Sequence, residues 1–262
     1  MNFFGTITAP NVVLSLMAAA VFLLAGWVKG VVGLGLPTIS MALLALIMTP
    51  AEAAALLIVP SLVTNVWQLR PWSTLGPMLR RLAPMQIGVC VGTLAGAWAL
   101  GAPAGAWAVV SLGAALIVYA LWGIVGAQLF VDPTTESWLG SVVGAATGVV
   151  TAATGVFVIP AVPYLQALGL KRDELIQAMG TSFTVSTLAL AVGLYFNGQY
   201  SSTALSTSVV MLLPAIGGMY AGELVRQRLS PVLFRRVFFG GLIVLGVYMI
   251  AREVIAHSSL PS

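Results

Sequence analysis

The sequence predicts an all-α polytopic membrane protein. Sixty per cent of the residues are hydrophobic and only 7% are charged, whereas a soluble domain carries about 25% charged residues. The mean hydropathy is +1.04, and the longest stretches without a charged residue are 82–131 and 175–222. Because one bilayer crossing needs about 20 apolar residues, each of these stretches is long enough for two crossings. The chain is therefore expected to cross a membrane several times.

Each half of the chain contains five apolar segments. They lie near residues 12–29, 36–48, 52–69, 82–100 and 105–130, and then near residues 138–154, 156–169, 174–196, 203–225 and 236–255. No Lys or Arg precedes the first segment as in a secretory signal, so we expect it to be retained as a helix. The first two segments of each half are short and meet at glycines, so they either cross fully or turn back inside the membrane. The prediction is eight to ten transmembrane segments, with a broken-helix hairpin in each half.

The third segment starts with a helix-capping signal. Thr49, Pro50 and Glu52 supply an N-cap threonine, a proline at the first helical position and a glutamate at the third. This pattern predicts a helix that begins at Pro50. It also explains Glu52 as a capping residue.

The two halves are expected to be repeats of one unit. Pairs that are 122 residues apart are Gly26 with Gly148, Gly33 with Gly155, and Glu52 with Glu174. An ordered series of such matches over about a hundred residues indicates an internal duplication. We therefore expect one integrated membrane domain made of two repeats, residues 1–131 and residues 132–262.

The basic residues predict that the two repeats have opposite orientations, because cytoplasmic loops collect Lys and Arg. An arginine-rich loop of the first half corresponds to residues 197–202 of the second half, which contain no arginine. An arginine-rich late loop of the second half corresponds to residues 101–104 of the first half, which also contain none. The arginines in question are Arg70, Arg80, Arg81, Arg226, Arg228, Arg235 and Arg236. Equivalent loops then lie on opposite faces of the membrane. This is an inverted-topology repeat with both termini on the outer, periplasmic side.

Lys29 is the one cation that this topology places away from a loop. It stands in the run Gly26-Trp-Val-Lys-Gly-Val-Val-Gly-Leu-Gly, at the break between the first two segments. A charge inside a membrane costs at least about 2.5 to 3.5 kcal/mol and is by default a candidate for function. The alternative is a lysine whose aliphatic stem carries the ammonium to the interface.

The glycine-containing breaks predict an anion site together with Lys29. Gly33 and Gly35 follow the lysine, and the break of the second half carries Thr154 and Gly155. A helix that restarts after such a break presents unpaired N–H groups and the positive end of its dipole. Two such ends near the midplane would bind an anion. The alternative is that the glycines serve close helix packing.

Polar side chains on the third segment of each half are expected to complete this site. Asn65 shares one helix face with Ser61, Thr64 and Gln68, at i, i+3, i+4 and i+7 spacing. The equivalent segment of the second half carries Gln177, Thr181, Ser182 and Ser186. Both faces are candidates for a polar pathway, although Ser and Thr also serve as bonds between helices.

The sequence argues against an enzyme, a metal site and a nucleic-acid-binding protein. His257 is the only histidine and lies near the end of the chain, which removes histidine-based catalysis and a histidine-rich metal site. Cys90 is the only cysteine, so a cysteine metal cluster is excluded. No carboxylate falls clearly in mid-membrane, and the basic residues lie in short loops and form no patch. We expect no cofactor and no nucleic-acid partner.

Several motifs resemble the sulfite exporter TauE/SafE family of bacterial inner-membrane proteins. The resemblance rests on the glycine-containing break in each half, the run Gln177-Ala-Met-Gly-Thr-Ser-Phe-Thr-Val-Ser, and the closing runs Leu229-Ser-Pro and Phe234-Arg-Arg-Val-Phe-Phe. It covers about residues 15–252. It implies a secondary transporter in the bacterial inner membrane that moves sulfite or an organosulfonate outward.

Alternative functions remain at this point. The chain could import or transport another small solute, such as thiosulfate or a carboxylate, or act as a non-transporting membrane scaffold. The partners expected from the sequence are a small anion and the lipid bilayer. The sequence does not determine the oligomeric state.

Overall fold

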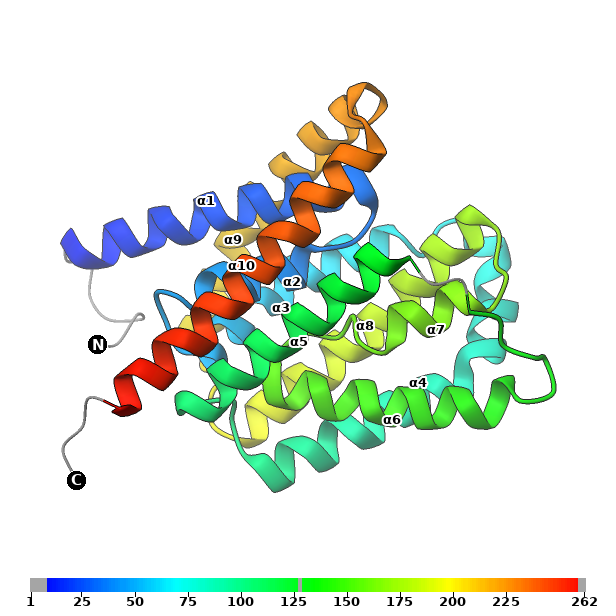
Figure 1. Ribbon diagram of the computed structural model, residues 1–262, viewed down its shortest axis with the longest axis horizontal. Helices are drawn as coiled ribbons and strands as arrows, with labels where there is room; N and C mark the ends of the chain where they lie inside the picture. Colours follow the sequence, from blue (N-terminus) through cyan, green and yellow to red (C-terminus); the bar gives the residue numbers. More distant parts are fainter. Residues whose placement is uncertain (1–8, 127–128, 259–262) are drawn as a thin grey trace.

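The part of the chain described by the computed structural model, residues 9–126 and 129–258, is helical and contains no strand. These residues form ten α-helices and one short 3-10 turn, and Figure 1 shows how the helices are arranged. The elements are α1 (Ala9–Val32), α2 (Leu36–Leu44), α3 (Pro50–Trp67), α4 (Trp72–Leu100), α5 (Gly105–Val125), α6 (Glu136–Thr154), α7 (Ala161–Ala167), α8 (Arg172–Phe196), α9 (Ser202–Val225), η1 (Arg226–Arg228) and α10 (Pro231–Ser258). The all-α prediction is confirmed.

Eight of these helices are long and apolar enough to cross a membrane, which agrees with the predicted eight to ten segments. The other two, α2 and α7, have 9 and 7 residues. At a rise of 1.5 Å per residue, even α2 is only about 14 Å long, less than half of a hydrocarbon core about 30 Å thick. In each half, the first long helix, α1 or α6, is therefore followed after a break by a short helix, α2 or α7.

Glycines in the left-handed region make these breaks. Gly33 has φ of 82° and Gly35 has φ of 111°, a region that L side chains rarely adopt. Pro37 then stands in the first turn of α2, where a proline is tolerated because its missing N–H has no helical partner. The break of the second half follows the same logic, since α6 ends at Gly155 with φ of 70°.

Two predicted boundaries were wrong. The first segment was expected near residues 12–29 and to be short, but α1 has 24 residues and continues through Lys29 to Val32. Arg80 and Arg81 were expected in a loop, but α4 already begins at Trp72. A helix satisfies its own backbone hydrogen bonds, so α4 extends past its apolar stretch into the polar interface. The last turn of α1 is instead buried in the protein, with Lys29 and Val31 at 2% and 7% exposure.

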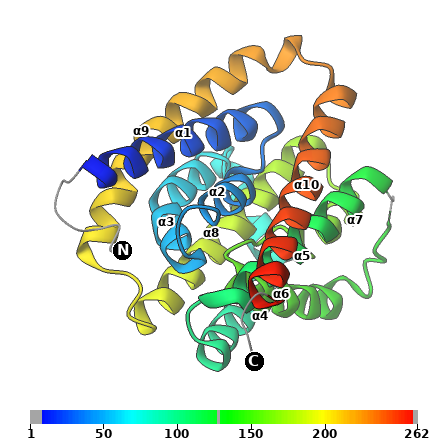
Figure 2. The same cartoon turned by 60° about the vertical axis from the view of Figure 1, so that its left-hand side comes forward.

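Helices α3 and α8 form the centre of the molecule. They pack against each other, and the pairs α1–α9 and α4–α6 lie on either side of them. Helices α5 and α10 form a further pair, and α2 lies between α1 and α10 (Figure 2). Polar residues on α3 and α8 are therefore removed from lipid.

Glycines set the close contacts within the flanking pairs. A Cβ built on Gly26 would overlap the backbone of Ala215 in α9. A Cβ on Gly148 would overlap the backbone of Thr93 and Val89 in α4. Small residues allow helix backbones to approach in this way inside membranes. For Gly26 and Gly148 the packing interpretation of the sequence is therefore the correct one.

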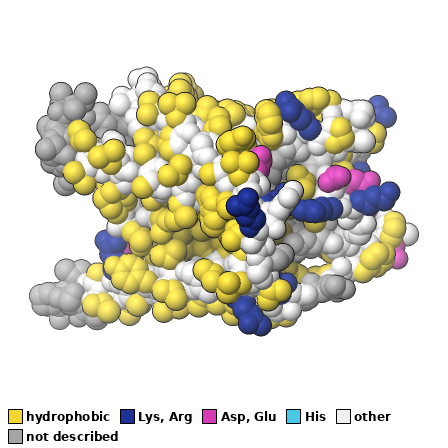
Figure 3. Space-filling model, turned by 90° about the horizontal axis from the view of Figure 1, so that it is seen from above, with side chains coloured by type: hydrophobic (Ala, Val, Ile, Leu, Met, Phe, Trp, Pro, Cys, Tyr) yellow, Lys and Arg dark blue, Asp and Glu magenta, His cyan; other side chains and the backbone are white. Residues whose placement is uncertain are grey.

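The surface matches a bilayer environment. Large hydrophobic side chains are exposed along the long helices, with Trp98 at 89% and Leu213 at 74% exposure. Figure 3 shows hydrophobic side chains over most of one face, whereas most Lys and Arg side chains gather toward one end. Helix α1 begins and α10 ends at the opposite end (Figure 1).

The predicted start of α3 is also confirmed. The Thr49 hydroxyl accepts a hydrogen bond from the Glu52 N–H at 3.3 Å, and the Glu52 carboxylate accepts one from the Thr49 N–H at 3.0 Å. This reciprocal pair is a capping box.

Candidate functional site

Lys29 is buried in the last turn of α1, where its side chain reaches α3. Its side chain is 2% exposed, so it does not reach the membrane interface. The ammonium Nζ donates hydrogen bonds to Thr64 Oγ1, at 3.1 Å, and to Asn65 Oδ1, both on α3. An ammonium carries three N–H donors, and these contacts use two of them.

A chain of hydrogen bonds continues from Lys29 across α3 to α8. Asn65 Nδ2 donates to Ser61 Oγ at 3.1 Å, and the hydroxyls of Ser61 and Thr187 share a hydrogen bond at 3.2 Å. All of these side chains are at most 2% exposed. The chain thus links α1, α3 and α8 through polar groups that have no contact with solvent.

Sequence reasoning missed Thr64 and Thr187 as candidate site residues. Thr64 was recognised only as a member of the polar face of α3, although it lies next to Asn65 and on the same side of that helix. Thr187 gave no signal of its own in the sequence, because the hydroxyl of a threonine in a helix often hydrogen-bonds to the backbone of the same helix. It does make that bond as well, to Phe183 O at 2.6 Å.

A hydrogen bond joins the first break to the end of α3, one helical turn beyond Asn65. The Gly33 carbonyl accepts a hydrogen bond from Gln68 Nε2, while Gln68 Oε1 is buried and has no partner among the described residues. Gly35 precedes α2 and packs near Val28 and Phe238. Lys29 and Gly33 are therefore held by neighbouring turns of one helix face.

The second break is surrounded by apolar atoms. Thr154 Oγ1 donates to Val150 O at 2.6 Å and accepts from the Val156 N–H at 3.1 Å, so it satisfies the backbone of its own break. A Cβ on Gly155 would meet the side chains of Met41, in α2, and Ala54, in α3. The predicted site residues of this break are not hydrogen-bonded to the Lys29 chain.

Gln177 holds a turn and has no bond to Lys29. Its Nε2 donates to Leu69 O at 2.6 Å and to Pro71 O at 2.8 Å, and its Oε1 accepts from Thr74 Oγ1 at 3.0 Å. These contacts fix the connection between α3 and α4 against the start of α8. Its amide is thus already engaged in structural contacts.

The remaining candidates on α8 differ in how they are satisfied. Thr181 Oγ1 donates to its own helix, at Gln177 O, over 2.9 Å. Ser182 and Ser186 are 0% exposed, and their hydroxyls have no partner among the described residues. A buried polar group without a partner costs about 1 to 3 kcal/mol. Two such hydroxyls, one helical turn apart, are therefore available to a ligand.

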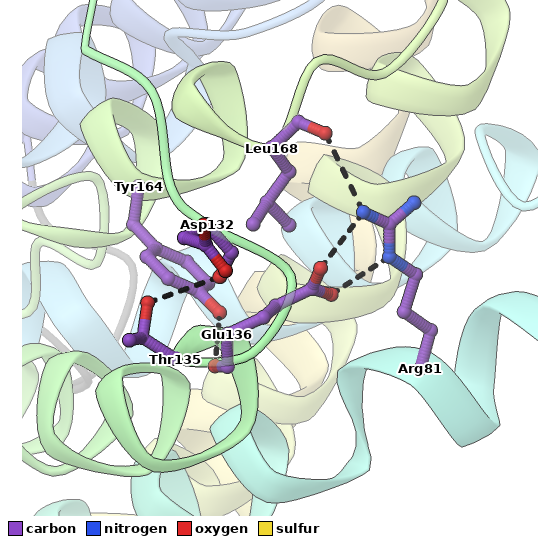
Figure 4. A network of polar contacts seen from close by, with 6 residues as sticks. All are labelled: Arg81, Asp132, Thr135, Glu136, Tyr164 and Leu168. Atoms are coloured by element: carbon purple, nitrogen blue, oxygen red, sulfur yellow. Dashed lines mark hydrogen bonds and ion pairs between the residues drawn. The ribbon is translucent and has the colours of Figure 1, made fainter.

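Lys29 has no carboxylate partner in the part of the chain that the structure describes. The ion pair found there joins Arg81 to Glu136, with Nε to Oε1 at 2.7 Å (Figure 4). Arg81 also donates to Leu168 O at 3.4 Å, and the Tyr164 hydroxyl donates to Glu136 O at 2.7 Å. These contacts join α4, the start of α6 and the end of α7, and they leave the Lys29 charge uncompensated.

Asp132 serves a turn outside the membrane spans. Its Oδ1 accepts hydrogen bonds from the Thr134 hydroxyl at 2.6 Å and from the Thr134 N–H at 2.8 Å. These bonds favour the charged form and lower the pKa of the Asp132 carboxyl below its usual value. The carboxylate stabilises the connection before α6.

Comparison with known protein families identifies the chain. The family model of the sulfite exporters TauE/SafE matches residues 18–249, nearly its full length. The chain belongs to the sulfite exporter TauE/SafE family. No curated protein and no solved structure gave a match.

Membership of the TauE/SafE family implies a membrane transporter of sulfur-containing anions. The resemblance stated from the sequence motifs is thereby confirmed. It also agrees with the prediction of a membrane protein without enzymatic activity, since the family consists of transporters. A small anionic substrate and a lipid bilayer are the partners that this family implies.

Proposed function

We propose that this TauE/SafE protein is a secondary transporter that exports sulfite or an organosulfonate by alternating access, with Lys29 as the cation that binds the anion. The observation that carries the proposal is a buried ammonium with one unused donor and no carboxylate partner among the described residues. An uncompensated charge in such a site is expensive. A bound sulfur oxyanion supplies the missing charge and accepts the third N–H bond.

Hydroxyls and the amide of Asn65 are proposed to complete the pocket. Asn65 and Thr64 position the ammonium, and Ser182 and Ser186 offer unpaired hydroxyls on α8, the helix that the hydrogen-bond chain reaches at Thr187. The proposed site also includes the break at Gly33 and Gly35. Thr154, Gly155, Gln177 and Thr181 stay outside this proposed pocket. Thr154 and Thr181 bond to the backbone of their own segments, Gly155 is packed against Met41 and Ala54, and the Gln177 amide bonds to the connection between α3 and α4.

Alternating access is supported by features typical of an inverted repeat, residues 1–131 and 132–262. The capping glutamates Glu52 and Glu174, 122 residues apart, accept from the N–H groups of Thr49 and Lys171 at 3.0 and 2.9 Å, so α3 and α8 begin alike. In the proposed repeat, α1 corresponds to α6 and α4 corresponds to α9. The contact between α1 and α9 is then equivalent to the contact between α6 and α4. In Figure 1, α1 runs from left to right and α6 from right to left.

The proposed location is the bacterial inner membrane, with the arginine-rich end in the cytoplasm. Most Lys and Arg side chains lie toward one end of the molecule (Figure 3), and cytoplasmic loops collect such residues. Both termini would then face the periplasm, since α1 begins and α10 ends at the other end.

Anion flux from proteoliposomes tests the proposal. Vesicles loaded with sulfite, or with an organosulfonate, are compared for the native chain, Lys29→Ala, Lys29→Arg and the control Lys171→Ala, which removes an exposed lysine at the start of α8. We expect Lys29→Ala to abolish flux and Lys171→Ala to retain it. Lys29→Arg keeps the charge, so it should retain part of the flux. Unchanged flux in Lys29→Ala would refute the site.

The same preparation separates sulfur anions from other solutes. A ligand that binds only the folded protein raises its apparent stability. We expect sulfite or an organosulfonate to raise the melting temperature of the native chain but not of Lys29→Ala. Stabilisation by a carboxylate alone would favour a different substrate, and the absence of stabilisation by any solute together with a copurifying protein would favour a scaffold.

A further inference from the structure

A basic vestibule opens at the arginine-rich end of the molecule. It is a cavity of about 700 Å³ beside Val31 and Val32, at the end of α1. Its ionisable lining residues are three arginines from three elements: Arg172 at the start of α8, Arg226 in η1 and Arg235 in α10. Among the residues that the structure describes, no acidic side chain lines it. The vestibule therefore favours an anion.

The arginines have donors to spare. Arg172 is exposed and Arg226 is half-buried, and neither has a hydrogen-bond or ion-pair partner among the described residues. Arg235 donates one bond, from Nη2 to Ile124 O at 3.0 Å. A guanidinium has five N–H donors in a planar fork that matches phosphate oxygens. Three such groups around one cavity can bind a phosphate or a similar oxyanion.

An apolar groove continues directly from this vestibule. It has a volume of about 400 Å³ and runs between α1 and α10, with α2 behind it. Leu229, Phe234 and Phe238 line both cavities, so the vestibule and the groove join at these three side chains. Figure 2 shows α1 and α10 inclined to each other, and the groove lies between side chains of these two helices.

The groove has the dimensions of an acyl chain. Along α10 its lining extends from Leu233 to Leu245, 12 residues apart. At 1.5 Å per residue this is about 18 Å, and one leaflet of the hydrocarbon core is about 15 Å deep. Trp27 lines the opposite wall, with its ring 5.9 Å from that of Phe234. The groove thus accepts an apolar chain that extends from the arginines toward the midplane.

We propose that the vestibule and the groove together form a binding site for one anionic phospholipid, with its phosphate on Arg172, Arg226 and Arg235 and an acyl chain between α1 and α10. A soluble anion would account for the arginines and not for the apolar groove that begins at them. A neutral lipid would account for the groove and not for three arginines without an acidic neighbour in the lining. Basic pockets between helices on the cytoplasmic side favour anionic headgroups.

Thermal unfolding of the purified full-length chain in detergent tests this site. The melting temperature is followed during titration with phosphatidylglycerol and, separately, with phosphatidylcholine of the same acyl chains. We expect phosphatidylglycerol to stabilise the native chain at lower concentration than phosphatidylcholine. In Arg172→Gln/Arg226→Gln, phosphatidylglycerol binding should weaken about 25-fold, because each arginine contributes roughly fivefold.

Two matched controls separate the site from general surface charge. Arg228→Gln/Arg236→Gln removes two arginines that do not line the vestibule, so it should retain the preference for phosphatidylglycerol. Gly241 lines the groove and Gly240 does not, and a Cβ at either position meets no atom within 4 Å. Gly241→Leu should therefore weaken lipid binding, whereas Gly240→Leu should not.

Three results would overturn the proposal. The first is equal stabilisation by both lipids, and the second is an equal loss in the two arginine double variants. The third is stabilisation by glycerol 3-phosphate as strong as that by phosphatidylglycerol, with Gly241→Leu unchanged, which would indicate a soluble anion at the arginines. Because the glycine variants remove no charge, they keep the test valid if the arginine variants do not fold.

Discussion

Replacing Asn65 by leucine should reveal how strongly the buried Lys29 depends on its partners. Asn65 accepts a hydrogen bond from Lys29 Nζ and donates one to Ser61 Oγ at 3.1 Å. Leucine has a similar volume and makes neither bond. Asn65→Leu therefore removes two polar contacts and leaves the packing of α3 nearly unchanged.

The magnitude follows from these two bonds. A hydrogen bond to a charged group contributes about 1.5 to 3 kcal/mol, and a neutral one about 1 kcal/mol. Asn65→Leu should therefore lower the free energy of unfolding by about 2.5 to 4 kcal/mol. Lys29→Met should have a smaller effect, because loss of the ammonium removes several kcal/mol of desolvation penalty together with its hydrogen bonds.

A double-mutant cycle isolates the interaction between the two residues. In the Lys29→Met background, Asn65→Leu loses only the neutral bond to Ser61, so it should cost only about 1 kcal/mol. The coupling between the two substitutions is then about 1.5 to 3 kcal/mol. Equilibrium unfolding of the four proteins in mixed micelles measures it. Additivity within about 0.5 kcal/mol would refute the reasoning.

The other predictions concern packing, capping and the ion pair, and each is measured as a change in unfolding free energy. Gly148→Ala should cost about 1 to 3 kcal/mol, because the added methyl group overpacks α6 against α4. Gly76→Ala has no neighbour within 4 Å and should stabilise α4 by up to about 1 kcal/mol. Similar changes in unfolding free energy for the two variants would contradict this. Thr49→Ala should cost about 1 kcal/mol through loss of the cap of α3, and no change would contradict the capping box. Arg81→Gln should cost less than about 1 kcal/mol, because Arg81 is 42% exposed and its pair with Glu136 is screened by solvent; a loss above about 3 kcal/mol would show that solvent does not screen the pair.

The features that the sequence predicted best are those controlled by local backbone chemistry. Gly33 and Gly155 marked the breaks because a positive φ excludes most other residues, and the threonine, proline and glutamate at the start of α3 specify a cap. In both cases the signal lies in a few consecutive residues. Lys29 is different, because the topology placed it away from a loop but left open whether its ammonium reaches the interface.

The partners of the polar side chains could not be predicted in the same way. Helical spacing placed Asn65 and Gln177 on comparable faces, yet Asn65 bonds to Lys29 while Gln177 bonds to the carbonyls of Leu69 and Pro71. The difference depends on where the connection between α3 and α4 lies in space. A periodic pattern reports which face is polar and does not report what that face meets.

The hydrogen-bond chain is distributed unevenly between the two proposed repeats, and this bears on the proposed mechanism. Lys29, Thr64, Asn65 and Ser61 all belong to residues 1–131, so both bonds of the ammonium lie within the first repeat. The link from this chain to the second repeat is the hydroxyl pair of Ser61 and Thr187 at 3.2 Å.

A neutral hydrogen bond of this kind contributes about 1 kcal/mol, less than either bond to the ammonium. Movement of α8 relative to α3 would therefore break only this neutral contact and leave the cation with both of its partners. In the proposed transporter, the first repeat would keep the anion bound through charge while the hydroxyls of α8 move toward it or away from it.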